Sequence, residues 1–161
     1  MRKIMLTVLA GSALTLVACG SSKSAASDPY AAPPAATTTT LPTATTVAVK
    51  TATTPLGQIL VDPSGRTLYA FTKDTNAMSS CTGACANTWP PALVTGAVKV
   101  DGNLSGGLFS VITRPDGTKQ LEAGKWPLYT FSGDSGPGDT NGQGSGGSWF
   151  VVGTQATLVK G

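Results

Sequence analysis

Two cysteines and a nearby methionine carry the most reactive side chains of the chain. Cys81 and Cys85 are separated by three residues, and Met78 lies just before them. The pair can close a small structural disulfide, act as a redox-active dithiol, or bind a soft metal ion such as copper(I) together with the Met78 thioether. We prefer the structural disulfide, because reactive thiolates and copper sites usually draw on a neighbouring histidine or cation that the sequence does not provide. We therefore expect no cofactor.

Histidine is absent from the entire sequence. It is the commonest general base and the commonest metal ligand, so serine–histidine hydrolysis is excluded. A mechanism with Asp74 and Asp134 as paired carboxylates would require both groups in one cleft, and their positions in the sequence do not demand that. We expect a protein without enzymatic activity.

The pattern Leu-Tyr-x-Phe-x-x-Asp occurs twice, at residues 68–74 and 128–134. In a strand, the tyrosine and phenylalanine of each copy are two residues apart and share a face. We expect each aspartate to end its strand by binding nearby backbone N–H groups in a local turn. The alternative is a shared groove between the copies that binds a sugar or peptide of the cell envelope. The candidate binding face consists of Tyr69, Phe71, Tyr129, Phe131, Asp74 and Asp134.

The third cysteine, Cys19, ends an apolar N-terminal segment. Arg2 and Lys3 precede this segment, which is too short to span a bilayer comfortably, and small residues come before Cys19. The arrangement resembles the lipobox of bacterial lipoprotein signal peptides, in which residues 1–18 are removed and the cysteine is acylated. The alternative is an ordinary secretory signal that leaves Cys19 unmodified. Under the first interpretation the protein is anchored to the outer face of the bacterial cell membrane.

The rest of the sequence divides into a tether and one small domain. Residues 19–55 start with the lipidated cysteine and continue in alanine, threonine and proline, a composition typical of a disordered tether. Residues 56–161 alternate apolar and polar residues between glycine-rich turns, which predicts an all-β domain of two related strand-hairpin halves with at most a short helical turn at 81–88. Predicted strands lie at 58–61, 67–71, 108–112, 128–131 and 149–152.

The charge balance bears on possible partners. Without its first 18 residues the chain keeps nine basic and eight acidic side chains, so no basic footprint for nucleic acid remains. The expected partners are the membrane, through lipid on Cys19, and an envelope polymer or protein.

The repeated motif also resembles a known family. Bacterial lipoproteins and secreted proteins carry a repeat with tyrosine, any residue, an aromatic residue, two residues and aspartate, and the likeness extends over residues 56–152. This resemblance implies a fold and an extracytoplasmic location, but no reaction. We therefore expect a lipid-anchored, non-catalytic binding or scaffolding module of the envelope. The alternative is a redox or electron-transfer accessory that uses Cys81 and Cys85.

Overall fold

The computed structural model describes residues 47–75 and 77–160. The predicted signal peptide, Cys19 and the tether up to residue 46 lie outside these residues. The elements are β1 (Val47–Thr54), β2 (Gly57–Val61), β3 (Tyr69–Phe71), α1 (Ala84–Thr88), β4 (Val98–Val100), η1 (Gly106–Leu108), β5 (Phe109–Thr113), β6 (Lys119–Ala123), β7 (Trp126–Tyr129), η2 (Ser145–Gly147) and β8 (Trp149–Val151).

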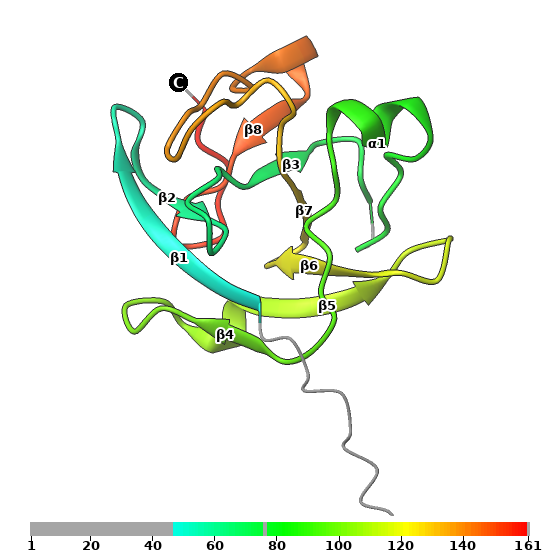
Figure 1. The fold of residues 1–161 in the computed structure, drawn as a ribbon, viewed down its shortest axis with the longest axis horizontal. Helices are drawn as coiled ribbons and strands as arrows, with labels where there is room; N and C mark the ends of the chain where they lie inside the picture. The colour runs from blue at the N-terminus through cyan, green and yellow to red at the C-terminus, as the bar shows by residue number, and fades with distance from the viewer. Residues whose placement is uncertain (1–46, 76, 161) are drawn as a thin grey trace, which may run out of the picture. The chain divides into compact units, whose positions relative to one another are not determined.

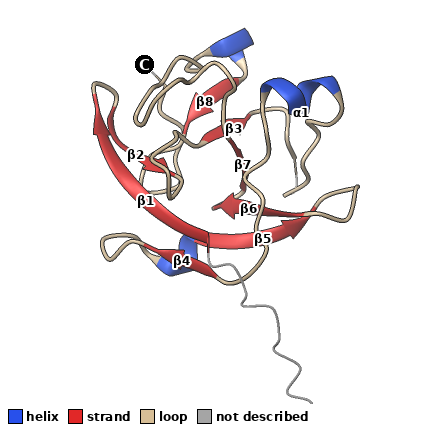
Figure 2. Ribbon diagram, viewed as in Figure 1, coloured by secondary structure: helices blue, strands red, loops and turns tan. Residues whose placement is uncertain are grey.

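Strands dominate the described residues and form two sheets (Figure 2). The smaller sheet has the order β2-β1-β4, and the larger has the order β5-β6-β7-β3-β8. Tight turns close the antiparallel hairpins β1–β2 and β5–β6, whereas β4 joins β1 in parallel. The only α-helix among the described residues is the short α1 beside the cysteine pair. The predicted all-β class with a short helical turn there is confirmed.

Strand β1 corrects the predicted limit of the tether. We expected residues 19–55 to be disordered, but residues 47–54 form β1 and pair with β2 from Lys50↔Val61 to Thr54↔Gly57. Figure 1 shows β1 running along one side of the domain. Its valines and threonines suit a strand, and Val49 is fully buried. A segment rich in alanine and threonine resembles a spacer in the sequence. Here it is a strand because β2 provides hydrogen-bond partners for its backbone.

The two halves of the domain are related by a shift of 60 residues. Tyr69 on β3 lies directly opposite Tyr129 on β7, in the middle of the larger sheet. Hydrogen bonds around this pair also occur at equivalent positions in both halves. Thr72 N donates to Ser148 O at 2.8 Å, and Ser132 N donates to Thr88 O at 2.9 Å. Each half therefore ends beside the motif strand of the other, and the repeats form one interlocked unit.

Both faces of the central strands are covered. On β3, Tyr69 enters an aromatic cluster, while Ala70 on the opposite face enters an aliphatic one. This explains why the motif has apolar residues at successive positions. The buried members of the aromatic cluster are Ile59, Val61, Tyr69, Cys81, Trp89, Tyr129, Trp149 and Val151. The aliphatic cluster includes Val49, Leu60, Leu68, Ala70, Leu121, Leu128 and Val152.

Within residues 47–75 and 77–160, no helix has the length and apolar character that a membrane crossing requires.

The place of β1 predicts where the folded domain must start. A chain that starts at residue 56 lacks β1 and the buried Val49, so both β2 and β4 lose their partner strand. We expect it to be destabilised by several kcal/mol, since burying one valine alone contributes about 1.5–3 kcal/mol. A chain that starts at residue 47 is the matched control, and urea unfolding measures both. Equal midpoints would contradict the assignment of β1 to the folded domain.

Candidate functional site

The two motif copies exchange their tyrosine–aspartate partners. The Tyr69 hydroxyl donates to Asp134 Oδ2 at 2.8 Å, and the Tyr129 hydroxyl donates to Asp74 Oδ2 at 2.6 Å. Each hydroxyl thus binds the carboxylate of the other repeat. The antiparallel pairing of β3 and β7 sets Tyr69 directly opposite Tyr129, and each tyrosine hydroxyl reaches the aspartate in the loop that follows the other motif strand.

The carboxylates do more than end their strands. Asp74 Oδ1 accepts bonds from the backbone N–H and the hydroxyl of Ser80, at 2.8 and 2.6 Å. Asp134 Oδ1 accepts from Asn141 N at 3.0 Å. We predicted a local turn around each aspartate, but these partners lie six and seven residues further along the chain. The aspartates therefore tie a whole loop to the opposite tyrosine.

These contacts shift the pKa of three groups. Burial, with a smaller effect of the bond to Asp74, raises the pKa of Tyr129 to about 12. Burial also raises the pKa of Tyr69, and the bond to Asp134 adds to the effect. The pKa of Asp134 is raised as well, mainly by burial. Both tyrosines are therefore neutral donors at ordinary pH.

The candidate binding face is corrected by burial of its tyrosines. Tyr69 and Tyr129 have no exposed surface, whereas Phe71 and Phe131 are partly buried around the aromatic cluster. The four side chains therefore do not form one solvent-facing groove. Large aromatic side chains such as these contribute mainly to the packing of the core.

Two tryptophans occupy the centre of this cluster. Trp89 and Trp149 stack on each other with ring centroids 3.9 Å apart and planes 3° apart. Phe71 stacks on Trp149 and Phe131 stacks on Trp89, both at 4.3 Å. We call these four rings the aromatic column. It is built from both repeats in equal share.

The cysteine pair forms a disulfide. Cys81 Sγ and Cys85 Sγ are bonded at 1.99 Å, and Cys81 is 1% exposed. Both thiols are used by this bond, and Met78 is 64% exposed, so the alternative of a soft-metal site from Met78, Cys81 and Cys85 is not formed. Among the described residues, no other group of three or more histidine, cysteine or acidic side chains gathers as a metal site would require. Redox exchange at the pair stays a prediction.

A buried arginine completes the polar interior, and sequence reasoning missed it. Arg114, 4% exposed, donates to Cys81 O at 2.9 Å, to Gln120 Oε1 at 2.7 Å and to the Ser79 hydroxyl. The Ser79 hydroxyl lies 2.6 Å from the Tyr129 hydroxyl, so a chain of hydrogen bonds leads from Arg114 to Asp74. Nothing in the sequence around Arg114 distinguishes it from the lysines and arginines that lie on the surface.

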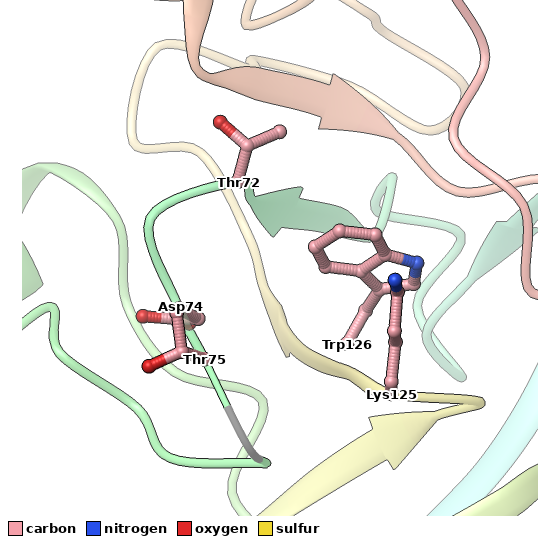
Figure 3. Close-up of a pocket in the computed structure, with 5 residues that line it drawn as sticks. All are labelled: Thr72, Asp74, Thr75, Lys125 and Trp126. Atoms are coloured by element: carbon pink, nitrogen blue, oxygen red, sulfur yellow. The ribbon is translucent and has the colours of Figure 1, made fainter.

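One pocket contains a residue of the repeated motif. It has a volume of about 410 Å³ and lies between the loop after β3 and the β6–β7 turn. Figure 3 shows Asp74 and Thr75 on one side of the pocket and Trp126 and Lys125 on the other. Thr72 completes the lining. The Lys125 ammonium lies 4.9 Å from the centre of the Trp126 ring, so an exposed lysine covers a half-buried indole.

Comparison with known proteins agrees with the internal repeat. The profile of a family described as a secreted repeat of unknown function matches residues 50–93 and again residues 110–153. The chain belongs to this family. The predicted resemblance is thereby confirmed, and the family's description places the secreted-repeat protein outside the cytoplasm. No curated protein and no solved structure matches it significantly.

The two secreted repeats differ at the pocket. Lys125 and Trp126 correspond to Gly65 and Arg66 in the other copy. There, Gly138 N donates to Gly65 O at 2.9 Å, and a Cβ on Gly65 would come within 2.9 Å of Pro137 Cβ. Pro137 therefore packs against Gly65, the counterpart of Lys125, whereas Lys125 and Trp126 border a pocket that residues of both repeats line.

The raised tyrosine pKa values predict a loss of stability in alkali. An unfolded tyrosine ionises near pH 10, whereas Tyr129 in the folded protein ionises at about 12. The contribution to stability is therefore complete below about pH 10 and is lost as the pH rises towards the folded pKa, by at most about 1.4 kcal/mol per pH unit for each tyrosine. Urea unfolding between about pH 9 and pH 12 measures this slope.

Tyr129→Phe should reduce that alkaline slope. Tyr30→Phe is the control, because Tyr30 lies outside the interlocked tyrosine pair. Identical slopes in the parent protein and in Tyr129→Phe would show that the buried hydroxyl does not resist ionisation.

Proposed function

We propose that this secreted-repeat protein is a non-catalytic binding module, held on the outer face of the cell membrane by lipid on Cys19, that takes a sugar unit of an envelope polymer in the Asp74–Trp126 pocket. The observation that carries the proposal is that this pocket, lined by residues of both repeats, is open at Lys125, whereas Pro137 packs against the corresponding Gly65. A position that is packed in one copy and open beside polar and aromatic side chains in the other suits a recognition role.

The lining has the chemistry that a sugar ring needs. A pyranose presents an apolar C–H face, which packs on an indole, and a rim of hydroxyls, which bond to carboxylates and threonine hydroxyls. Trp126 offers the ring, and the polar residues Asp74, Thr72 and Thr75 line the same pocket. Its volume lies within the range of small-molecule sites, about 300–1,000 Å³.

The Asp74 carboxylate is held in place before any ligand arrives. Three hydrogen bonds, two from Ser80 and one from Tyr129, fix both of its oxygens. Oδ2, which accepts only the bond from Tyr129, keeps further acceptor capacity. A fixed acceptor avoids the loss of side-chain entropy on binding.

Lys125 adds a cover that can move. It is exposed, and its ammonium rests over the indole. Side chains of this length leave such a position at small cost, since exposed cation–π contacts contribute about 0.5–1 kcal/mol.

The same lining supports a binding role rather than catalysis. Hydrolysis of a glycosidic bond generally uses two carboxyl groups placed on either side of the bond. Asp74 is the one acidic residue that lines the pocket. Asp134 is engaged separately with Tyr69 and Asn141.

Sugar binding is tested with a panel of soluble saccharides from bacterial envelope polymers, titrated against the full chain by calorimetry. Trp126→Ala should weaken binding of any saccharide that binds the parent protein by about tenfold or more, as expected for about 1.4 kcal/mol or more of lost stacking. Phe150→Ala is a matched control, because Lys160 lies 5.7 Å from the Phe150 ring in the same manner but outside the pocket. Equal affinity of both variants, or no binding of any saccharide, would refute the assignment.

Anchoring is a separate part of the proposal and has its own test. Cells that express the parent protein with radiolabelled palmitate should yield labelled protein in the membrane fraction, because two acyl chains give stable attachment. Cys19→Ser should lose the label and leave the membrane. The double variant Cys81→Ser/Cys85→Ser keeps Cys19 and should keep the label, whereas label retained by Cys19→Ser would exclude acylation at this position.

A further inference from the structure

The aromatic column combines two features that packing alone does not require. Its three stacked contacts have centroid distances of 3.9 to 4.3 Å. Aromatic pairs in proteins more often lie about 4.5–7 Å apart, in offset or edge-to-face contact. The rings of the column are thus close enough for their π-systems to overlap from Phe71 to Phe131.

A tyrosine joins each tryptophan of the column. Tyr69 meets Trp89 edge-on with centroids 5.4 Å apart, and Tyr129 meets Trp149 edge-on at 5.1 Å. Each tyrosine hydroxyl in turn donates to a carboxylate, as described above. Both indoles of the column therefore touch a phenol whose proton already has an acceptor.

We propose that the aromatic column and its two tyrosine–aspartate pairs form a one-electron redox centre, in which an oxidising equivalent taken up by Trp89 or Trp149 ends as a neutral tyrosyl radical on Tyr69 or Tyr129. The external partner is a high-potential one-electron oxidant. It takes one electron from an indole and is itself reduced, which leaves a tryptophan radical cation in the column.

The second step moves one electron and one proton together. The tyrosine gives its electron to the tryptophan radical cation, and its hydroxyl proton goes to the bonded carboxylate. The products are a neutral indole, a neutral tyrosyl radical and a protonated aspartic acid. The sum of charges is zero before and after the step, and this matters because Trp89, Trp149 and both phenols are buried, where an uncompensated charge is costly.

The surroundings favour this outcome at both tyrosines. On one side, Ser79 and Arg114 extend the hydrogen bonds of Tyr129, which hold its hydroxyl in line with Asp74. On the other side, Gly142 N approaches the Tyr69 hydroxyl at 3.3 Å, and a Cβ on Gly142 would come within 2.7 Å of the Trp89 ring. The glycine thus permits the backbone to close over the Tyr69–Trp89 contact and exclude water from it.

The redox centre is independent of the sugar pocket, and Trp126 makes the distinction testable. Trp126 belongs to the pocket and to the edge of the aliphatic cluster, away from the column. Tyr30, outside the described residues, stays in every variant as an internal reference for an ordinary tyrosine.

The experiment oxidises the full chain with flash-generated tris(bipyridine)ruthenium(III) and follows the radicals by transient absorption and electron paramagnetic resonance. The parent protein should form a tryptophan radical that decays into a neutral tyrosyl radical, more slowly in deuterated water because a proton moves in that step. The double variant Tyr69→Phe/Tyr129→Phe should lose most of the tyrosyl signal and keep a longer-lived tryptophan radical. Trp126→Phe should behave as the parent protein does.

Two results would overturn the redox centre. One is an unchanged tyrosyl signal in the double variant, which would assign the radical to Tyr30. The other is loss of the signal in Trp126→Phe, which would place the oxidation at the surface. If the double variant does not fold, mass spectrometry of oxidised parent protein decides: products at Tyr69 or Tyr129 support the centre, and products confined to Tyr30 and Trp126 refute it.

Discussion

The exchange of tyrosine–aspartate partners between the repeats is the interaction on which the rest of the domain depends. A fully buried hydroxyl needs an acceptor, and each tyrosine finds it only on the other repeat. Neither half can satisfy its own motif, so the halves must fold together. Trp149 lies on β8, which pairs with β3, and the two carboxylates hold the loops that precede Trp89 and Trp149.

The interior is nearly symmetric, and the differences between the repeats lie towards its edges. The disulfide Cys81–Cys85 in the first repeat corresponds to Asn141 and Ser145 in the second, where a glycine-rich loop takes the place of the bridge. Likewise, Lys125 borders an open pocket, whereas Pro137 packs against the corresponding Gly65. Shared contacts hold the fold, whereas the unshared ones distinguish one repeat from the other, and the proposed sugar site rests on one of these differences.

The strands that sequence reasoning found are those whose residues favour a strand by themselves. The motif strands, β5 and β8 are rich in aromatic and β-branched residues, and the turn Arg114–Gly117 marks the hairpin that leads to β6. β1 was assigned to the tether and β4 was not predicted. β1 continues a long run of alanine and threonine, and β4 has only three residues, so neither stands out from its neighbours in the sequence. Their strand structure comes from the pairing of β1 with β2 and with β4.

The sequence alone predicted the internal repeat, the all-β class and the family, and it favoured a disulfide over a redox-active or metal-binding pair. These features depend on residue types and on short spacings along the chain. The folded structure was needed to establish that Tyr69 and Tyr129 are interior groups, that each binds the aspartate of the other repeat, that Arg114 is buried and that Trp126 and Asp74 line one pocket. The physical reason is that these contacts join residues many positions apart. The antiparallel register of β3 and β7 decides which aspartate each tyrosine reaches, and this register cannot be read from the spacing of residues within either motif.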